Sequence, residues 1–365
     1  MTTITAPANA LPADSLDTKH MRSAIIASTL GWALDLFDLF ILLYVAPVVG
    51  ALFFPSEYPT LSLAAVYASF AVTLLMRPVG SAIFGRYADV HGRKGAMIIA
   101  MVGVGISTAA FGLLPTIQTI GFVAPVLFVI LRLVQGVFVG GVVASTHTVG
   151  TESVPAHWRG GMSGLVGGGG AGIGALFASI VFLVTSWAFP GEAFAQWDWR
   201  FMFFSGLLSA ILGLYIFRNL EESPYFKRLQ EEKAARKVAT PASPLKTLFS
   251  VDYRRILLVN ILITFGGGAG YYLTSGYLPT VLKVINGVSN YSAALILMGA
   301  SIAAIVSAIS IGMLSDRIGR KRTFLIVGAC ALVLLPILYL GLGSATDTSR
   351  IVFYSLAIAF IGNAG

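Results

Sequence analysis

The feature that most constrains this chain is a series of long apolar runs extending from one end of the sequence to the other. Charged residues make up only 11% of the sequence, against about 25% in soluble domains. A helix of about 20 apolar residues spans a bilayer. The sequence therefore predicts an all-α membrane protein with many spans. We expect these at residues 23–54, 62–86, 95–115, 121–148, 160–188, 199–218, 255–283, 291–315, 322–343 and 350–365.

Basic residues in the connections gather on one side of the predicted bundle, and this explains the net charge of +8 without any nucleic-acid partner. Positive loops lie in the cytoplasm. We therefore expect a multi-pass protein of the cytoplasmic (inner) membrane of a bacterium, with its N-terminus in the cytoplasm. The one long charged connection, residues 219–252, reads as a cytoplasmic linker. It divides the chain into an N-terminal six-helix bundle (1–218, with 1–20 a flexible tail) and a second bundle (253–365).

A ten-residue pattern occurs twice, each time between two spans on the basic side. Residues 85–94 read GRYADVHGRK and residues 312–321 read GMLSDRIGRK. Glycine permits tight turns and close helix approach, and the aspartate can pair with the cations or sit against a helix N-terminus. We interpret the pair as cytoplasmic gating loops, the alternative being basic loops that serve only topology. Their residues are Gly85, Asp89, Gly92, Arg93, Lys94, Gly312, Asp316, Arg317, Gly319, Arg320 and Lys321.

The repeated G-x-x-x-D-x-x-G-R-K resembles the loop signature of major facilitator superfamily transporters, although Val90 replaces a basic residue in the first copy. Other segments resemble the metabolite:proton symporters and the related sialate and monocarboxylate symporters. These segments are GWALDLFDLFILLY (31–44), RPVGSAIFGRYAD (77–89), RLVQGVFVGG (132–141), ESPYF (222–226) and YYLTSGYLPTVL (271–282). The resemblance implies two pseudo-symmetric six-helix bundles, the second truncated so that about ten of twelve helices are present. A monomer is expected.

Charged residues inside spans are functional candidates, because burying charge in a membrane is unfavourable. Asp35 and Asp38 lie three residues apart in the first span and so share a helix face. Arg132 in the fourth span keeps its charge and can bind a carboxylate bidentately. The resemblance implies that protonation of Asp38, assisted by Asp35, frees Arg132 for coupling or substrate binding. The alternative is a structural ion pair between helices. Arg77 is expected to have a structural or gating role.

Span seven, with the run GGGAGYYLTSGYLPT at 266–280, is expected to be a weakened helix lining a cavity. Tyr271, Tyr272, Tyr277 and Asn260 are its substrate-binding candidates, with aromatic packing as the alternative for the tyrosines. In span five, GLVGGGGAGIGALFAS (164–179) is expected to be a small-residue packing stripe.

These observations favour secondary active transport of a small organic acid by proton symport with alternating access. Proton-antiport efflux is one alternative, and a non-transporting receptor on the same fold is another. We expect no enzymatic activity, no metal, no cofactor besides the coupling proton, and no nucleic-acid partner. The expected partners are a small organic anion and the lipid bilayer.

Overall fold

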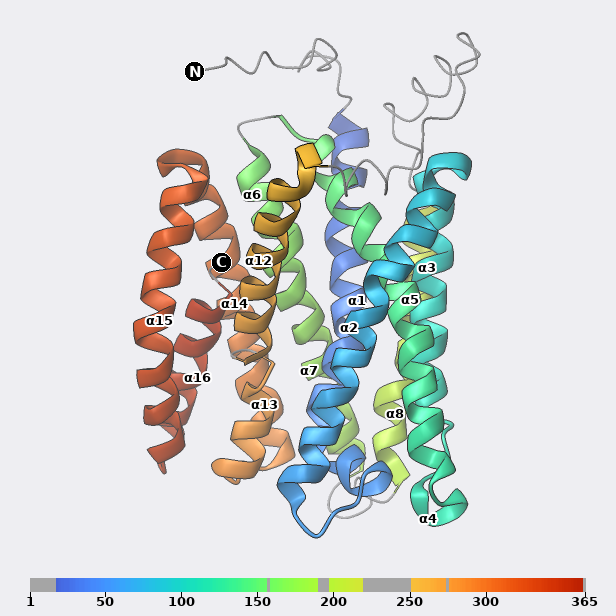
Figure 1. Ribbon diagram of the computed structural model, residues 1–365. Helices are drawn as coiled ribbons and strands as arrows, with labels where there is room; N and C mark the ends of the chain where they lie inside the picture. Colours follow the sequence, from blue (N-terminus) through green and yellow to red (C-terminus); the bar gives the residue numbers. More distant parts are fainter. Residues whose placement is uncertain (1–17, 156–157, 190–196, 219–250, 274–275, 364–365) are drawn as a thin grey trace.

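The chain forms a bundle of long helices running up and down the height of the molecule (Figure 1). The computed structural model describes residues 18–155, 158–189, 197–218, 251–273 and 276–363. The helices of the first half are α1 (Thr18–Phe53), α2 (Pro59–His91), α3 (Arg93–Phe111), α4 (Ile117–Ile120), α5 (Val123–Glu152), α6 (Arg159–Gly164), the π-helical turn η3 (Leu165–Gly169), α7 (Gly170–Ala188), α8 (Trp199–Phe204) and α9 (Gly206–Arg218). The second half contains α12 (Val251–Leu273), α13 (Leu278–Thr280), the π-helical turn η5 (Val281–Ile285), α14 (Asn290–Ile318), α15 (Arg320–Ser344) and α16 (Thr348–Gly362).

The predicted all-helical membrane architecture is confirmed. In the described part of the chain, seven helical segments are long and apolar enough to cross a membrane, and two further apolar helices are shorter. The long segments are Met21–Phe53, Pro59–Ala88, Lys94–Phe111, Val123–Val143, Arg159–Ala188, Asn290–Ile318 and Arg320–Ser344, and the shorter ones are Trp199–Tyr215 and Thr348–Gly362.

Three predicted boundaries need correction. Residues 1–17 of the expected tail lie outside the described residues, but α1 already begins at Thr18, so the last part of that segment is helical. Most of the expected linker, 219–250, also lies outside them, and its last two residues belong to α12. Span seven is not one helix as far as residue 283. Its described parts are α12, the short α13 and η5, because Pro279 begins a new helical turn and cannot donate a backbone hydrogen bond to an earlier one.

The two ends of the bundle differ in the connections they carry. Both repeated loops and the start of α1 lie at one end, uppermost in Figure 1, which we call the loop end. The opposite end, with the α1–α2 and α15–α16 connections, is the far end.

α1 is the central helix of the first half, packed against α2, α3, α5, α7, α8 and α9. Its segment from Ile41 to Ala46 is at most 1% exposed. The polar side chains in the middle of this helix, Asp35, Asp38 and Tyr44, are therefore enclosed by protein.

Glycines set the closest helix contacts. In the α2–α5 pair, a Cβ at Gly140 would overlap the Arg77 carbonyl. Between the halves, α14 packs against α6, η3 and α7. There a Cβ at Gly164 would come within 2.5 Å of the Ala308 carbonyl oxygen, and one at Gly168 within 2.6 Å of the Ala308 Cβ. The predicted small-residue stripe of span five is thus confirmed, and it forms the seam between the two halves.

Candidate functional site

Two acids of α1 lie inside the first half, where each is only 2% exposed. Asp38 accepts a hydrogen bond from the Ser209 hydroxyl of α9, at 3.3 Å to Oδ1 and 3.2 Å to Oδ2. Neither oxygen of Asp35 has a hydrogen-bond partner among the described residues. The charge that acts on Asp35 comes from Arg77 of α2. An ionised carboxylate without a partner is unfavourable in such surroundings, and protonation removes that penalty.

Arg132 of α5 is enclosed by aromatic rings and is 1% exposed. Its guanidinium carbon lies 4.6 Å from the centre of the Phe111 ring, 5.1 Å from that of Phe70 and 5.4 Å from that of Phe128. Such cation–π contacts stabilise a desolvated cation by about 2 kcal/mol. Nε and Nη2 have no hydrogen-bond partner among the described residues. The rings therefore replace part of the solvent that the arginine has lost.

Gln135 connects the arginine to α3, and sequence reasoning missed it. Arg132 Nη1 donates to Gln135 Oε1 at 2.7 Å, and Gln135 Nε2 donates to the Thr108 hydroxyl of α3 at 2.7 Å. The available signal was a polar residue one helical turn after the arginine in an apolar span. Asp38 accepts from Ser209 and Arg132 donates to Gln135, so these two charged residues do not hydrogen-bond each other in the described structure.

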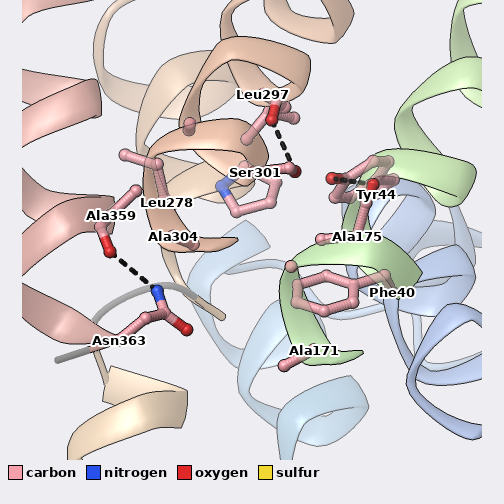
Figure 2. A pocket seen from close by; sticks show the side chains of 13 residues that line it. Phe40, Tyr44, Ala171, Ala175, Leu278, Leu297, Ser301, Ala304, Ala359 and Asn363 are labelled. Atoms are coloured by element: carbon pink, nitrogen blue, oxygen red, sulfur yellow. Dashed lines mark hydrogen bonds between the residues drawn. The ribbon is translucent and has the colours of Figure 1, made fainter. Parts of the chain in front are cut away.

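A small cavity lies between the two halves, with a volume of about 30 Å³. α1 and α7 form one wall, and α13, α14 and α16 form much of the other (Figure 2). Every described residue that lines it is uncharged. The polar groups there are the side chains of Tyr44, Ser301 and Asn363. The Tyr44 hydroxyl lies 2.8 Å from Ser179 Oγ.

Of the substrate-binding residues expected from the sequence, Arg132, Tyr277 and Asn260 are described and do not line this cavity. The side chains of Tyr271 and Tyr272 lie outside what the structure describes. Tyr277 is 37% exposed, with its ring 5.9 Å from that of Tyr67. The exposed Asn260 donates to the carbonyl of Ile256 in its own helix. Arg132 is buried within the first half. Four cavity residues are additions that the sequence analysis did not single out: Phe40 and Tyr44, which lie in the quoted 31–44 segment, and Ser301 and Asn363, which lie in no quoted motif.

At the loop end, the second repeated loop contacts the first half directly. Asp316 accepts hydrogen bonds from the backbone nitrogens of Gly160 at 3.0 Å and Gly161 at 2.9 Å, at the start of α6. This is the helix N-terminus contact that the sequence had left as one option for the aspartate. Gly319 has a φ of 91°, as the predicted tight turn requires.

The first repeated loop has the same turn but a different contact. Gly92 has a φ of 99°. Lys94 donates to the carbonyl of Arg218 at 2.7 Å, at the C-terminus of α9, where a cation is favourable. The side chains of Asp89 and Arg93 lie outside what the structure describes. No atom lies within 4 Å of a Cβ placed at Gly85, among the described residues.

At the far end, α13 and η5 close the halves against each other. Tyr67 of α2 shares a 2.8 Å hydrogen bond with Thr280. Lys283 donates to the carbonyl of Tyr44 at 3.2 Å and lies 4.9 Å from the centre of the Phe182 ring. Contacts between the halves thus lie at both ends of the molecule, on either side of the cavity.

Comparisons with known proteins agree with this architecture. The profile of the Major Facilitator Superfamily matches residues 24–365. The proline/betaine transporter of Escherichia coli (strain K12) is 34% identical over 327 residues, covering 88% of this chain and 65% of that protein. The glycine betaine/proline/ectoine/pipecolic acid transporter OusA of Dickeya dadantii (strain 3937) is 31% identical over 353 residues, covering 96% of this chain and 70% of that protein.

Two further matches concern location and fold. The inner membrane metabolite transport protein YhjE of Escherichia coli (strain K12) is 32% identical over 349 residues, 93% of this chain and 77% of that protein. The xylose transporter XylE from E. coli, in a partially occluded inward-open conformation, superposes with a TM-score of 0.66 at 20% identity, covering 93% of this chain and 84% of that one. The two-bundle fold, the repeated loop and the family profile agree, and this multi-pass membrane protein belongs to the Major Facilitator Superfamily.

Proposed function

We propose that this chain carries out proton-coupled uptake of a small solute that bears a carboxylate, by alternating access between its two halves. Asp38 carries the proton with Asp35 beside it, and Arg132 couples the proton to the substrate. The loop end faces the cytoplasm, in keeping with its Lys and Arg residues.

The observation that carries the proposal is the pair of buried acids in α1, at 2% exposure each. A fixed structural charge in a membrane protein is expected to be fully paired. Asp35 has no hydrogen-bond partner in the described part of the chain, and Asp38 accepts there from the neutral Ser209 hydroxyl. Such groups suit a proton that is taken up on one side and released on the other.

Within the class of carboxylates, the cavity favours a zwitterion. Its lining holds no charge among the described residues, so a solute with no net charge suits it best. The rings of Phe40 and Tyr44 can face a cationic nitrogen. The Ser301 hydroxyl, which donates to the Leu297 carbonyl at 2.7 Å, can turn from it to donate to a carboxylate. Relatives named for proline and betaine transport fit the same chemistry. An organic anion is the second candidate, favoured by Lys283 beside Tyr44.

Uptake into proteoliposomes tests the proposal, with radiolabelled glycine betaine, proline and a monocarboxylate as probes. An inward proton gradient is expected to drive accumulation, and Asp38→Asn is expected to abolish it while leaving exchange of labelled for unlabelled solute. The exposed Asp347→Asn is the control, since its carboxylate makes no capping hydrogen bond. Full accumulation by Asp38→Asn would overturn the assignment of the proton carrier. Accumulation only under an outward proton gradient would support antiport efflux instead.

A further inference from the structure

The Ser209 hydroxyl of α9 has more acceptors within reach than it has hydrogens. It is fully buried, and its oxygen lies 2.8 Å from the Gly206 carbonyl oxygen and 3.2 and 3.3 Å from the two carboxyl oxygens of Asp38. A hydroxyl has one hydrogen to donate. Hydrogen bonds between oxygens are usually about 2.7–2.8 Å long, and those to an ionised carboxylate are shorter still. The contact with Gly206 is therefore the stronger one in this conformation.

The two acceptors differ in what can change at them. The Gly206 carbonyl is fixed by helix packing, because α9 lies so close to α3 that a Cβ at Gly105 would come within 2.6 Å of the carbonyl oxygen. This acceptor is always neutral. Asp38, in contrast, is a weak acceptor while it is protonated and a strong one when it is ionised. The preferred position of the Ser209 hydrogen therefore depends on the proton of Asp38.

We propose that Ser209 is the positioning residue that determines how readily Asp38 releases its proton. The inference rests on the proposed function, in which Asp38 carries the proton. While Asp38 is protonated, the Ser209 hydrogen stays on the Gly206 carbonyl. Once Asp38 ionises, the hydroxyl turns about its Cα–Cβ bond and donates to the carboxylate. Ser209 thus stabilises the ionised form of Asp38 and leaves the protonated form unaffected.

The charged neighbours of Asp38 lie on α1 and α2. Asp35, one helical turn earlier, shares its helix face and disfavours a second negative charge when ionised. From α2, the Arg77 charge acts on Asp35. The segments α4, η3, α7 and α13 carry no titratable side chain. The other described titratable groups on elements around α1 contact other partners or lie at the loop end: Tyr67 bonds Thr280, Arg132 bonds Gln135, His147 packs against Trp32, Arg200 bonds the Leu114 carbonyl, Lys283 bonds the Tyr44 carbonyl, Lys94 bonds the Arg218 carbonyl, and Tyr215 is exposed.

A serine with a purely structural role would also be buried, since serine hydroxyls often bond the carbonyl three or four residues earlier in their own helix. The test variant is Ser209→Ala, which removes the donor. Ser355→Ala is the matched control, because Ser355 of α16 is as fully buried and its hydroxyl donates to the Ile351 carbonyl of its own helix. Ser209→Cys, whose thiol is a weak donor, is expected to behave like Ser209→Ala and serves if that variant does not fold.

The first measurement does not depend on transport. The infrared carboxyl band of Asp38, identified by its loss in Asp38→Asn, is followed against pH in the purified chain. A hydrogen bond to a charged group corresponds to roughly a tenfold change in proton affinity, or about one pH unit. Because the lost donor stabilised the ionised form, the midpoint is expected about one unit higher in Ser209→Ala than in the wild type. A midpoint that coincides with that of Ser355→Ala, or that moves to lower pH, would overturn the inference.

The second measurement is the pH profile of glycine betaine exchange in proteoliposomes. At pH values below the midpoint, Ser209→Ala should exchange like the wild type, because Asp38 is then protonated in both. At higher pH its profile should be displaced upward by the same pH unit. Equal slowing at every pH would show a structural role and refute the inference.

The two measurements together separate this inference from the proposed function. If the band midpoint moves as expected but the wild type shows no proton-driven uptake, the proposed function fails and the assignment of Ser209 stands. If uptake is proton-driven and the midpoint does not move, the assignment fails and the function stands.

Discussion

Replacing Asp316 by asparagine should open the loop end. The carboxylate accepts from two backbone nitrogens of the first half, at 3.0 and 2.9 Å. Asparagine keeps the shape but has one acceptor oxygen, so one of these nitrogens loses its partner and the charge beside the helix N-terminus is lost. Hydrogen bonds to charged groups contribute about 1.5–3 kcal/mol and the helix dipole about 0.3–1 kcal/mol. Since Asp316 is exposed, solvent screening reduces the sum to about 1–2 kcal/mol.

That free energy corresponds to roughly a 5- to 30-fold rise in the population open at the loop end. The assay is the rate at which a membrane-impermeant thiol reagent modifies a cysteine placed at Ser301, which lines the cavity and is 5% exposed. The exposed Cys330 is first replaced by serine. The rate should rise with Asp316→Asn in the Ser301→Cys chain.

Asp347→Asn is again the control, as it removes an aspartate from a helix N-terminus that it does not cap. A folded Asp316→Asn protein modified at the wild-type rate would refute the reasoning, because the contact would then contribute nothing to closure. Equal acceleration by Asp347→Asn would point to a general loss of charge instead.

Three further predictions concern the far end, the helix packing and the arginine. Lys283→Met keeps the length of the side chain but loses its hydrogen bond and cation–π contact. A cysteine placed at the fully buried Leu282 should then react with the thiol reagent on the order of tenfold faster. Arg350→Met, at the exposed far end, should leave this rate unchanged. Gly140→Ala should lower the thermal unfolding temperature, because the added Cβ overlaps the Arg77 carbonyl and overpacking destabilises by about 1–3 kcal/mol. Gly85→Ala should not lower it, because no described atom lies within 4 Å of a Cβ placed there. Equal effects of the two substitutions would contradict the packing argument. Phe111→Leu removes the ring nearest to Arg132 and should weaken proton-driven uptake more than Phe353→Leu, an exposed phenylalanine of α16.

The helices could be predicted from the sequence because a bilayer requires long apolar runs. The ten predicted runs coincide with helical segments, except that span seven is broken, span six is divided between α8 and α9, and span five contains the π-helical turn η3. Asp35, Asp38 and Arg132 could be singled out because charge inside an apolar run is conspicuous. Their hydrogen-bond partners could not be predicted. Gln135 and Thr108 come from different helices, and their meeting depends on the α3–α5 packing.

The cavity illustrates a second limit. Its walls come from five helices, and its polar groups are residue types that occur all along the chain. Tyr277 and Asn260 had the same chemistry and a glycine-rich context, but the helix directions turn them elsewhere. Which face of a helix points to the centre depends on the packing of its neighbours, which a single span does not record.

The glycine seam between α7 and α14 has a consequence for the speed of conformational change. Glycine and alanine have no side-chain rotamers to reorder, so sliding one surface over the other at these residues requires little side-chain reordering. The packed surface between the two halves therefore offers little resistance to sliding at this seam. The free-energy barrier to the rocking of the halves then comes from the contacts at the two ends of the molecule. These are the contacts of Asp316 at the loop end and of Lys283 and Thr280 at the far end. Substitutions at these end contacts should alter the rate of turnover, whereas substitutions in the glycine seam should alter whether the two halves can pack together.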